Sequence, residues 1–221
     1  MQPSATTGPE PASWPGFGRG YRAVKALIRV LFPPAFRLLY HWRVTGREHL
    51  QGLGAAVTLC NHVHTLDCVM MALAMPHKEL LFLSLPDNLH KPLVGPIVRG
   101  MGGVAVPQSA AEYRAFYRRL QPELAAGRFL QIYPEGWLEP GCPTLRPFHP
   151  GAFQMAVRFG VPVVPCVLRP YARPQGRPGL ELCILEPIAP DARLSRRAAA
   201  RQLGAQARAA MLDALGLPPE A

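Results

Sequence analysis

The chain has 221 residues, of which 49% are hydrophobic, so it can bury the core of one globular domain and is short for two. Its formal net charge of +10 points to an anionic partner such as nucleic acid, anionic lipid or an acidic donor molecule. Its five cysteines have no CxxC spacing, which argues against a disulfide framework or a zinc site and favours a reducing compartment.

The N-terminal region divides into two parts. Residues 1–18 are rich in Pro, Ser, Thr and Gly, and we expect a disordered tail there and no secretory signal peptide. Residues 19–42 are basic, since no acidic residue occurs between Glu10 and Glu48, and they are also amphipathic. One helix face gathers the apolar side chains of Val24, Leu27, Ile28, Leu31 and Phe32. Pro33 and Pro34 are expected to break this segment.

A membrane-interface segment is the favoured interpretation of residues 19–42. No uninterrupted apolar run reaches the roughly 18 residues of a spanning helix. We therefore expect a peripheral protein, held on an anionic membrane surface at its cytoplasmic face. An ordinary surface helix packed on the core is the alternative. Nucleic acid is not expected as a partner, because the basic residues alternate with aliphatic ones and no recognisable binding module is present.

Residues 43–217 alternate short apolar runs with helical patterns, which predicts a single α/β domain. We expect a mixed, mostly parallel sheet of about seven strands flanked by helices. The candidate strands are residues 42–45, 55–60, 80–85, 103–106, 129–133, 163–168 and 180–185. Candidate helices are residues 66–75 with Thr65 as N-cap, a helix opened by the capping box Ser109 to Glu112, residues 152–159, and a final helix from Ser195 whose arginines, Arg208 included, form a solvated face.

The most informative stretch is residues 61–67, Asn-His-Val-His-Thr-Leu-Asp, where a strand becomes a helix. His62 lies in the predicted turn and Asp67 in the first helical turn, where the helix dipole favours a carboxylate. A sharp turn brings the two together, so His62 is predicted to act as a general base oriented by Asp67. A metal triad of His62, His64 and Asp67 is not expected, because the usual spacing and the additional histidine are missing. His64 is predicted to be a loop residue.

Four motifs in order resemble the glycerolipid acyltransferases typified by lysophosphatidic acid acyltransferase. The first is Asn-His-x4-Asp at residues 61–67. Residues 102–108 are similar to the second motif, residues 133–136 (Tyr-Pro-Glu-Gly) to the third, and residues 161–165 to the fourth. The resemblance implies transfer of an acyl group from acyl-CoA or acyl carrier protein, as a co-substrate and with no bound cofactor, to a lipid hydroxyl in phospholipid biosynthesis. It also implies that Glu135 and Gly136 shape the acceptor or oxyanion region.

Two positions depart from the family pattern. Gln108 stands where the family has an arginine, and Trp137-Leu138 follow Glu-Gly where the family has Thr-Arg. The cations that recognise a phosphate are therefore missing from their usual places, so Gln108 and Trp137 are expected to contact an acceptor that lacks a free phosphate. Arg99 and Arg146 are candidate replacement cations. Two alternatives stay open: a thioester hydrolase in which His62 activates water, and a non-catalytic membrane lipid-binding protein.

Overall fold

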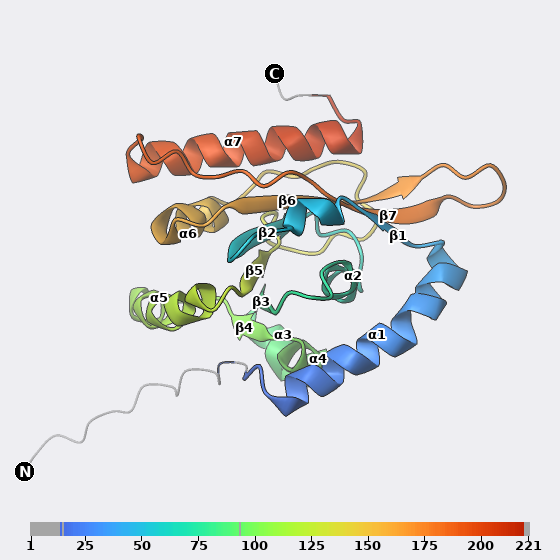
Figure 1. The fold of residues 1–221 in the computed structure, drawn as a ribbon, viewed down its shortest axis with the longest axis horizontal. Helices are drawn as coiled ribbons and strands as arrows, with labels where there is room; N and C mark the ends of the chain where they lie inside the picture. The colour runs from blue at the N-terminus through green and yellow to red at the C-terminus, as the bar shows by residue number, and fades with distance from the viewer. Residues whose placement is uncertain (1–13, 15, 93, 219–221) are drawn as a thin grey trace, which may run out of the picture.

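Seven strands form one sheet in the order β1-β7-β6-β2-β5-β3-β4 (Figure 1). The structure is a computed structural model that describes residues 14, 16–92 and 94–218. The strands are β1 (Arg43–Thr45), β2 (Ala56–Cys60), β3 (Leu80–Ser84), β4 (Gly103–Ala105), β5 (Phe129–Ile132), β6 (Val163–Tyr171) and β7 (Gly179–Ile184). Every neighbouring pair is parallel except β6 and β7. The predicted α/β class and the mixed, mostly parallel sheet are confirmed.

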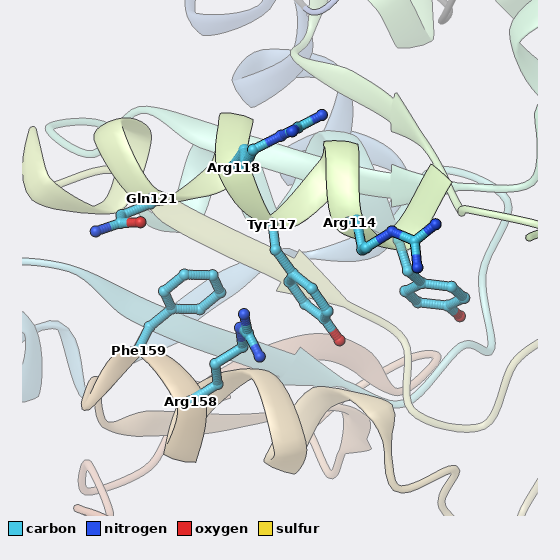
Figure 2. A pocket seen from close by; sticks show the side chains of 7 residues that line it. Arg114, Tyr117, Arg118, Gln121, Arg158 and Phe159 are labelled. Atoms are coloured by element: carbon cyan, nitrogen blue, oxygen red, sulfur yellow. The ribbon is translucent and has the colours of Figure 1, made fainter. Parts of the chain in front are cut away.

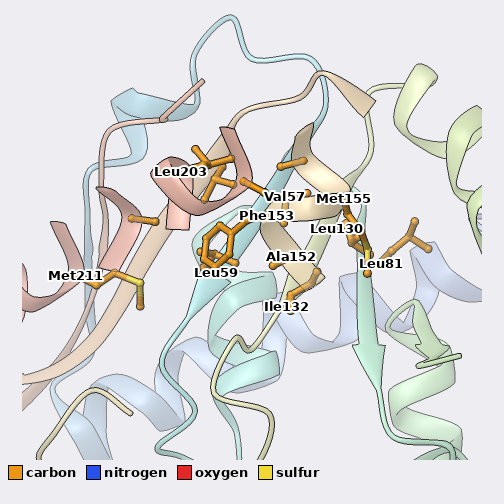
Figure 3. Close-up of a cluster of buried hydrophobic side chains, with 14 of the residues drawn as sticks. Val57, Leu59, Leu81, Leu130, Ile132, Ala152, Phe153, Met155, Leu203 and Met211 are labelled. Atoms are coloured by element: carbon orange, nitrogen blue, oxygen red, sulfur yellow. The ribbon is translucent and has the colours of Figure 1, made fainter. Parts of the chain in front are cut away.

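Both faces of the sheet are covered by helices, which explains why β2 and β5 are buried along their whole length. Successive side chains point to opposite faces, so Val57 and Leu59 enter one hydrophobic cluster while Ala56 and Cys60 enter the other. Figure 3 shows the first cluster, where Val57 and Leu59 lie close to Phe153.

The helices fall into two groups. On the first face lie α5 (Ala110–Ala125), α6 (Gly151–Phe159) and α7 (Arg196–Leu215). The other face is covered by α1 (Arg19–Tyr40) and α2 (Asp67–Ala74). The structure adds three short elements that the sequence pattern did not predict: a 3-10 helix (Arg47–Leu50), α3 (Pro86–His90) and α4 (Val94–Gly100).

Local capping signals place the starts of two helices. The Ser109 hydroxyl accepts a hydrogen bond from the Glu112 backbone N–H, and the Glu112 carboxylate accepts one from the Gln108 N–H at 2.9 Å. Ser195 caps α7 in the same way through the N–H of Ala198. The predicted capping box and the predicted start of the last helix are confirmed.

The predicted break at Pro33 and Pro34 is wrong, because α1 is one helix of 22 residues that contains both prolines. Each proline removes one helix hydrogen bond, and tertiary packing compensates: Ile28 before the prolines and Phe36 after them are both buried in the second cluster. Among the helices that the structure describes, α1 included, none has the length and apolar character required to cross a bilayer.

Apolar side chains on α1 are divided between the core and the solvent. Leu27, Leu31 and Leu38 are 58%, 55% and 78% exposed, and their spacing places them close to one line along the helix. Most of the segment predicted as a disordered tail lies outside the described residues. Trp14 and Phe17 are described, and both pack against the first hydrophobic cluster.

Candidate active site

Asn61 fixes the turn that carries His62. Its side chain is buried beyond the end of β2 and replaces a backbone pairing with β6. The Asn61 amide donates to the Leu168 carbonyl at 2.9 Å, and its carbonyl oxygen accepts from the Leu168 N–H at 2.7 Å. These two bonds continue the sheet by one residue through a side chain, so the chain leaves the sheet immediately afterwards with His62 at its carboxyl edge.

His62 and Asp67 form a close pair. Nδ1 of His62 lies 2.6 Å from Oδ2 of Asp67, whose residue is 1% exposed, in the first turn of α2. A carboxylate accepts, so Nδ1 carries the proton and Nε2 is left as the basic nitrogen of a neutral imidazole. The predicted N-cap at Thr65 is wrong, because Leu66 occupies that position and its N–H donates to Nδ1 of His64 at 3.1 Å. His64 thus stabilises the turn, and burial lowers its pKa.

Tyr133 supports the imidazole from one side. Its ring stacks on that of His62 with centroids 4.0 Å apart and planes 14° apart. Burial raises the pKa of Tyr133 well above its usual value, and the nearby Asp67 carboxylate adds to the effect. The phenol is therefore neutral, and its oxygen is buried near the Asp67 carboxylate. Stacking restricts rotation of the His62 ring.

Glu135 and Arg146 form a buried ion pair beside this histidine. Glu135 is 0% exposed, and its Oε2 accepts from Nε of Arg146 at 2.6 Å. Burial raises the pKa of Glu135, and the arginine acts in the opposite direction. A terminal nitrogen of Arg146 also donates to the carbonyls of Trp137 and His62, at 2.6 and 3.4 Å. One guanidinium therefore joins the Glu-Gly motif to the histidine turn.

The loop after Gly136 is tied to the same turn. The N–H of Glu139 donates to the His62 carbonyl, and that of Gly141 donates to the Val63 carbonyl, both at 2.9 Å. Gly136 has a φ of 88°, and a Cβ there would lie 2.9 Å from Nε2 of His149, so glycine is needed. The Gly136 N–H already donates to the Tyr133 carbonyl. It is therefore engaged within the loop.

Three predicted binding residues lie in different surroundings. Gln108 is exposed after β4 and donates to the Val106 carbonyl. Trp137 is 56% exposed, and the Arg146 guanidinium lies 4.7 Å from its ring centroid. Arg99 hydrogen-bonds to the Leu89 carbonyl between α3 and α4. The structure thus brings Glu135, Gly136, Trp137 and Arg146 together at the His62–Asp67 pair, whereas the described hydrogen bonds of Gln108 and Arg99 lie outside this group.

A cavity of about 860 Å³ adjoins the turn. Asn61, Val63 and His64 line one side of it, and residues 140–144 another. A third side is formed by the end of β6, where Arg169 donates to Glu181 at 3.0 Å. This volume lies within the range of pockets that hold small organic ligands. Within the described residues, no group of three or more His, Cys, Asp or Glu side chains is placed to hold a metal ion.

Sequence reasoning assigned no role to Tyr133 and treated Arg208 as part of a solvated face. Arg208 instead reaches from α7 to donate to the carbonyls of Leu145 and Arg146, at 2.8 and 2.6 Å. It thus supports the segment that carries Arg146. The position of Tyr133 directly before Pro-Glu-Gly was a signal, but the partner of its ring lies 71 residues earlier in the chain. Nothing local distinguishes Arg208 from its neighbouring arginines.

Comparison with solved structures gives a similar fold. The crystal structure of the 1-acyl-sn-glycerophosphate acyltransferase PlsC from Thermotoga maritima superposes with a TM-score of 0.61 and 22% identity, covering 87% of this chain and 81% of that one.

Curated relatives include a lyso-ornithine lipid O-acyltransferase of Pseudomonas aeruginosa, 30% identical over 131 residues, which are 59% of this chain and 48% of the relative. An uncharacterised protein of Mycobacterium bovis is 29% identical over 156 residues, 65% of this chain and 40% of that protein. The matches thus span less than half of these relatives' length. A family model described as Acyltransferase matches residues 41–169, more than half of the chain and all four motifs. The chain therefore belongs to the Acyltransferase family.

Proposed function

We propose that this protein transfers a fatty acyl group from a thioester, acyl-CoA or acyl carrier protein, to a hydroxyl of a lysolipid. The observation that carries the proposal is the 2.6 Å contact between His62 and Asp67 at the carboxyl edge of a mostly parallel sheet. The pair supplies a base with a fixed tautomer in the position where such sheets bind ligands.

The reaction requires one proton acceptor. Nε2 of His62 takes the proton of the acceptor hydroxyl while the hydroxyl oxygen attacks the thioester carbonyl. The tetrahedral adduct then expels the thiolate, which receives the proton from the imidazolium. Asp67 stabilises the transient positive charge through the hydrogen bond to Nδ1. The products are an ester and a free thiol.

Direct attack is favoured over an acyl-enzyme intermediate because the nearest thiols are poor nucleophiles. Burial raises the pKa of Cys68, next to Asp67, to about 12. The pKa of Cys60 is also raised well above its usual value, again chiefly by burial. Neither thiol forms a useful amount of thiolate near neutral pH, and a thioester is already activated.

Glu135 is proposed to bind the acceptor as well as the loop. Arg146 occupies Oε2, whereas Oε1 is buried and has no hydrogen-bond partner among the described residues. A buried carboxylate oxygen without a hydrogen-bond partner is a strong acceptor for a hydroxyl group. An acceptor with a diol or a hydroxyacyl group can donate one hydroxyl proton to His62 and a second hydrogen bond to Oε1 of Glu135.

The acceptor is proposed to carry a masked phosphate or none. Gln108 offers only neutral hydrogen bonds. Arg146 is 8% exposed: its Nε and one terminal nitrogen are bonded to Glu135 and two carbonyls, and the other terminal nitrogen is buried 3.5 Å from a Glu139 carboxylate oxygen. A free phosphate monoester is best held by arginines whose donors are accessible, whereas the Arg146 guanidinium is buried against Glu135. The relative that acylates a lyso-ornithine lipid supports this choice, because its substrate name denotes a lipid with an amino-acid headgroup.

We place the enzyme peripherally on the cytoplasmic face of an anionic membrane, held by α1. The exposed apolar line of Leu27, Leu31 and Leu38 fits a helix lying in the interface. The same helix carries the exposed arginines Arg22, Arg29 and Arg37, which favour an anionic surface. The lysolipid then reaches His62 from the same surface.

One assay tests the transferase against its alternatives. Purified protein is mixed with a labelled acyl thioester, with lyso-ornithine lipid, with lysophosphatidic acid or with no acceptor, and thiol release and lipid product are followed. Release that depends on an acceptor supports the transferase. Equal release without acceptor identifies a hydrolase, and no release with any donor and acceptor indicates a binding protein.

A further inference from the structure

A second hollow lies between α5 and α6, apart from the cavity beside His62. Its volume is about 390 Å³. Figure 2 shows Tyr117 and Arg158 facing each other across the hollow, with Phe159 beside them. Arg114, Arg118 and Gln121 from α5 complete its wall together with Tyr113. We call this the α5–α6 groove.

The charge of the groove is uncompensated. Its lining contains Arg114, Arg118 and Arg158 and no carboxylate. The acidic residues of α5 are engaged elsewhere: Glu112 closes the capping box, and Glu123 accepts from Arg128 at 2.7 Å. None of the ion pairs that the described residues form includes a groove arginine. Three arginines around one hollow without a carboxylate favour a ligand with more than one negative charge.

Flat apolar surfaces accompany these cations. The guanidinium carbon of Arg158 lies 4.6 Å from the ring centroid of Tyr117, and the Tyr117 and Phe159 rings have centroids 5.9 Å apart. Aromatic rings and guanidinium planes are the surfaces on which nucleobases stack, and the Gln121 amide offers both a donor and an acceptor for a base edge. A simple phosphate would use the arginines and leave the rings without a role.

We propose that the α5–α6 groove binds a phosphorylated purine nucleotide, the nucleotide end of coenzyme A, and so anchors the acyl donor away from the reacting carbonyl. This inference rests on the proposed function only where it identifies the nucleotide as part of the acyl donor. The purine stacks on Tyr117 and Phe159, and the phosphates bind Arg114, Arg118 and Arg158.

The topology places this anchor within reach of His62. Because β2, β5, β3 and β4 are all parallel, His62 and the start of α5 lie at the same edge of the sheet. The start of α5 follows β4, three strands from β2, a lateral distance of about 14 Å at the usual strand spacing. Tyr113 and Arg114 lie at that end of the groove, so an extended pantetheine arm can lead from them toward the base.

Binding of adenosine 3′,5′-bisphosphate, measured by calorimetry on the full chain, tests the site without acyl transfer. The variants are Arg114→Ala, Arg118→Ala and Arg158→Ala, and the control is Arg197→Ala on α7, an exposed arginine outside the groove. We expect binding that weakens with salt and falls about tenfold for each groove variant, with wild-type affinity for the control. No binding by the wild-type protein, or equal binding by all variants, overturns the proposal.

Donor kinetics then connect the groove to the reaction. The KM for acyl-CoA is expected to rise about tenfold in the groove variants, while wild type and variants do not differ with acyl-pantetheine, which lacks the nucleotide. An equal rise in KM with both donors overturns the anchor role. The role is also overturned if the wild-type protein does not bind the bisphosphate and the groove variants instead lose binding of acyl carrier protein. Bisphosphate binding by a protein that transfers no acyl group rejects the proposed function and retains the nucleotide site.

Discussion

Replacing Arg146 with methionine tests whether this arginine holds the active-site loop or clamps a phosphate. The change removes the donors to Glu135, Trp137 and His62 and leaves the carboxyl group of Glu135 0% exposed and without its arginine. Removing one partner of a buried pair costs about 3–5 kcal/mol, against a total stability of about 5–15 kcal/mol for an ordinary domain. We expect a loss of that size, together with a loss of activity toward every acceptor.

The double variant Arg146→Met/Glu135→Met serves as the control. It removes the buried charge along with its partner, so most of the stability should return while the activity does not. Urea unfolding gives the free energies, and kcat/KM is compared for lysophosphatidic acid and lyso-ornithine lipid with one donor. A single variant that is as stable as the wild type and loses only its activity toward lysophosphatidic acid would refute the loop-holding role and identify a phosphate clamp.

Three further changes test other parts of the account. The triple variant Leu27→Ser/Leu31→Ser/Leu38→Ser should reduce flotation with anionic liposomes by at least about tenfold, whereas Leu194→Ser, elsewhere on the surface, should not; unchanged flotation would exclude α1 as the anchor. Glu181→Gln should cost about 1.5–3 kcal/mol at pH 7. Burial raises the pKa of Glu181, but hydrogen bonds from Arg43 and Arg169 outweigh this effect and lower the pKa below 4.5. The stabilisation by Glu181 is therefore complete above pH 4.5 and disappears as the pH falls through the lower folded-state pKa. A stability difference that persists in acid would contradict this assignment. Gly136→Ala should cost about 1–3 kcal/mol, because φ is 88° and the new methyl group meets His149; denaturant midpoints equal to wild type would show that the loop adapts.

Sequence patterns predicted the sheet well because its signals are local. Most strands are short, largely apolar runs bounded by turn residues, and β2 and β5 are buried along their whole length. The capping residues Ser109 and Ser195 bond within three residues of themselves. Two expectations failed where packing outweighs propensity. Helix α1 continues through Pro33 and Pro34, and Leu66 takes the N-cap position expected for Thr65, with its N–H bonded to the His64 ring.

The same distinction separates the parts of the site that could be predicted from those that could not. His62 and Asp67 are five positions apart, so one turn determines their contact. The stacking of Tyr133 on His62 and the support of Arg208 for the loop join segments more than 60 residues apart. Such contacts depend on strand order, which no short pattern encodes. Arg146 was selected as a cation near the motifs, but only its position shows that it is buried and bonded to Glu135 and two carbonyls.

The most direct test of the central claim is the turnover of His62→Ala at saturating thioester donor and lysolipid acceptor. The side chain of His62 is 22% exposed, so we expect the variant to remain folded, as near-UV circular dichroism would show. Loss of a positioned base predicts a fall in kcat of about 10²- to 10⁴-fold, with a smaller but clear fall for Asp67→Asn through a misdirected imidazole. Near-normal turnover of His62→Ala would contradict the account, because no other group beside the turn is proposed to accept the hydroxyl proton.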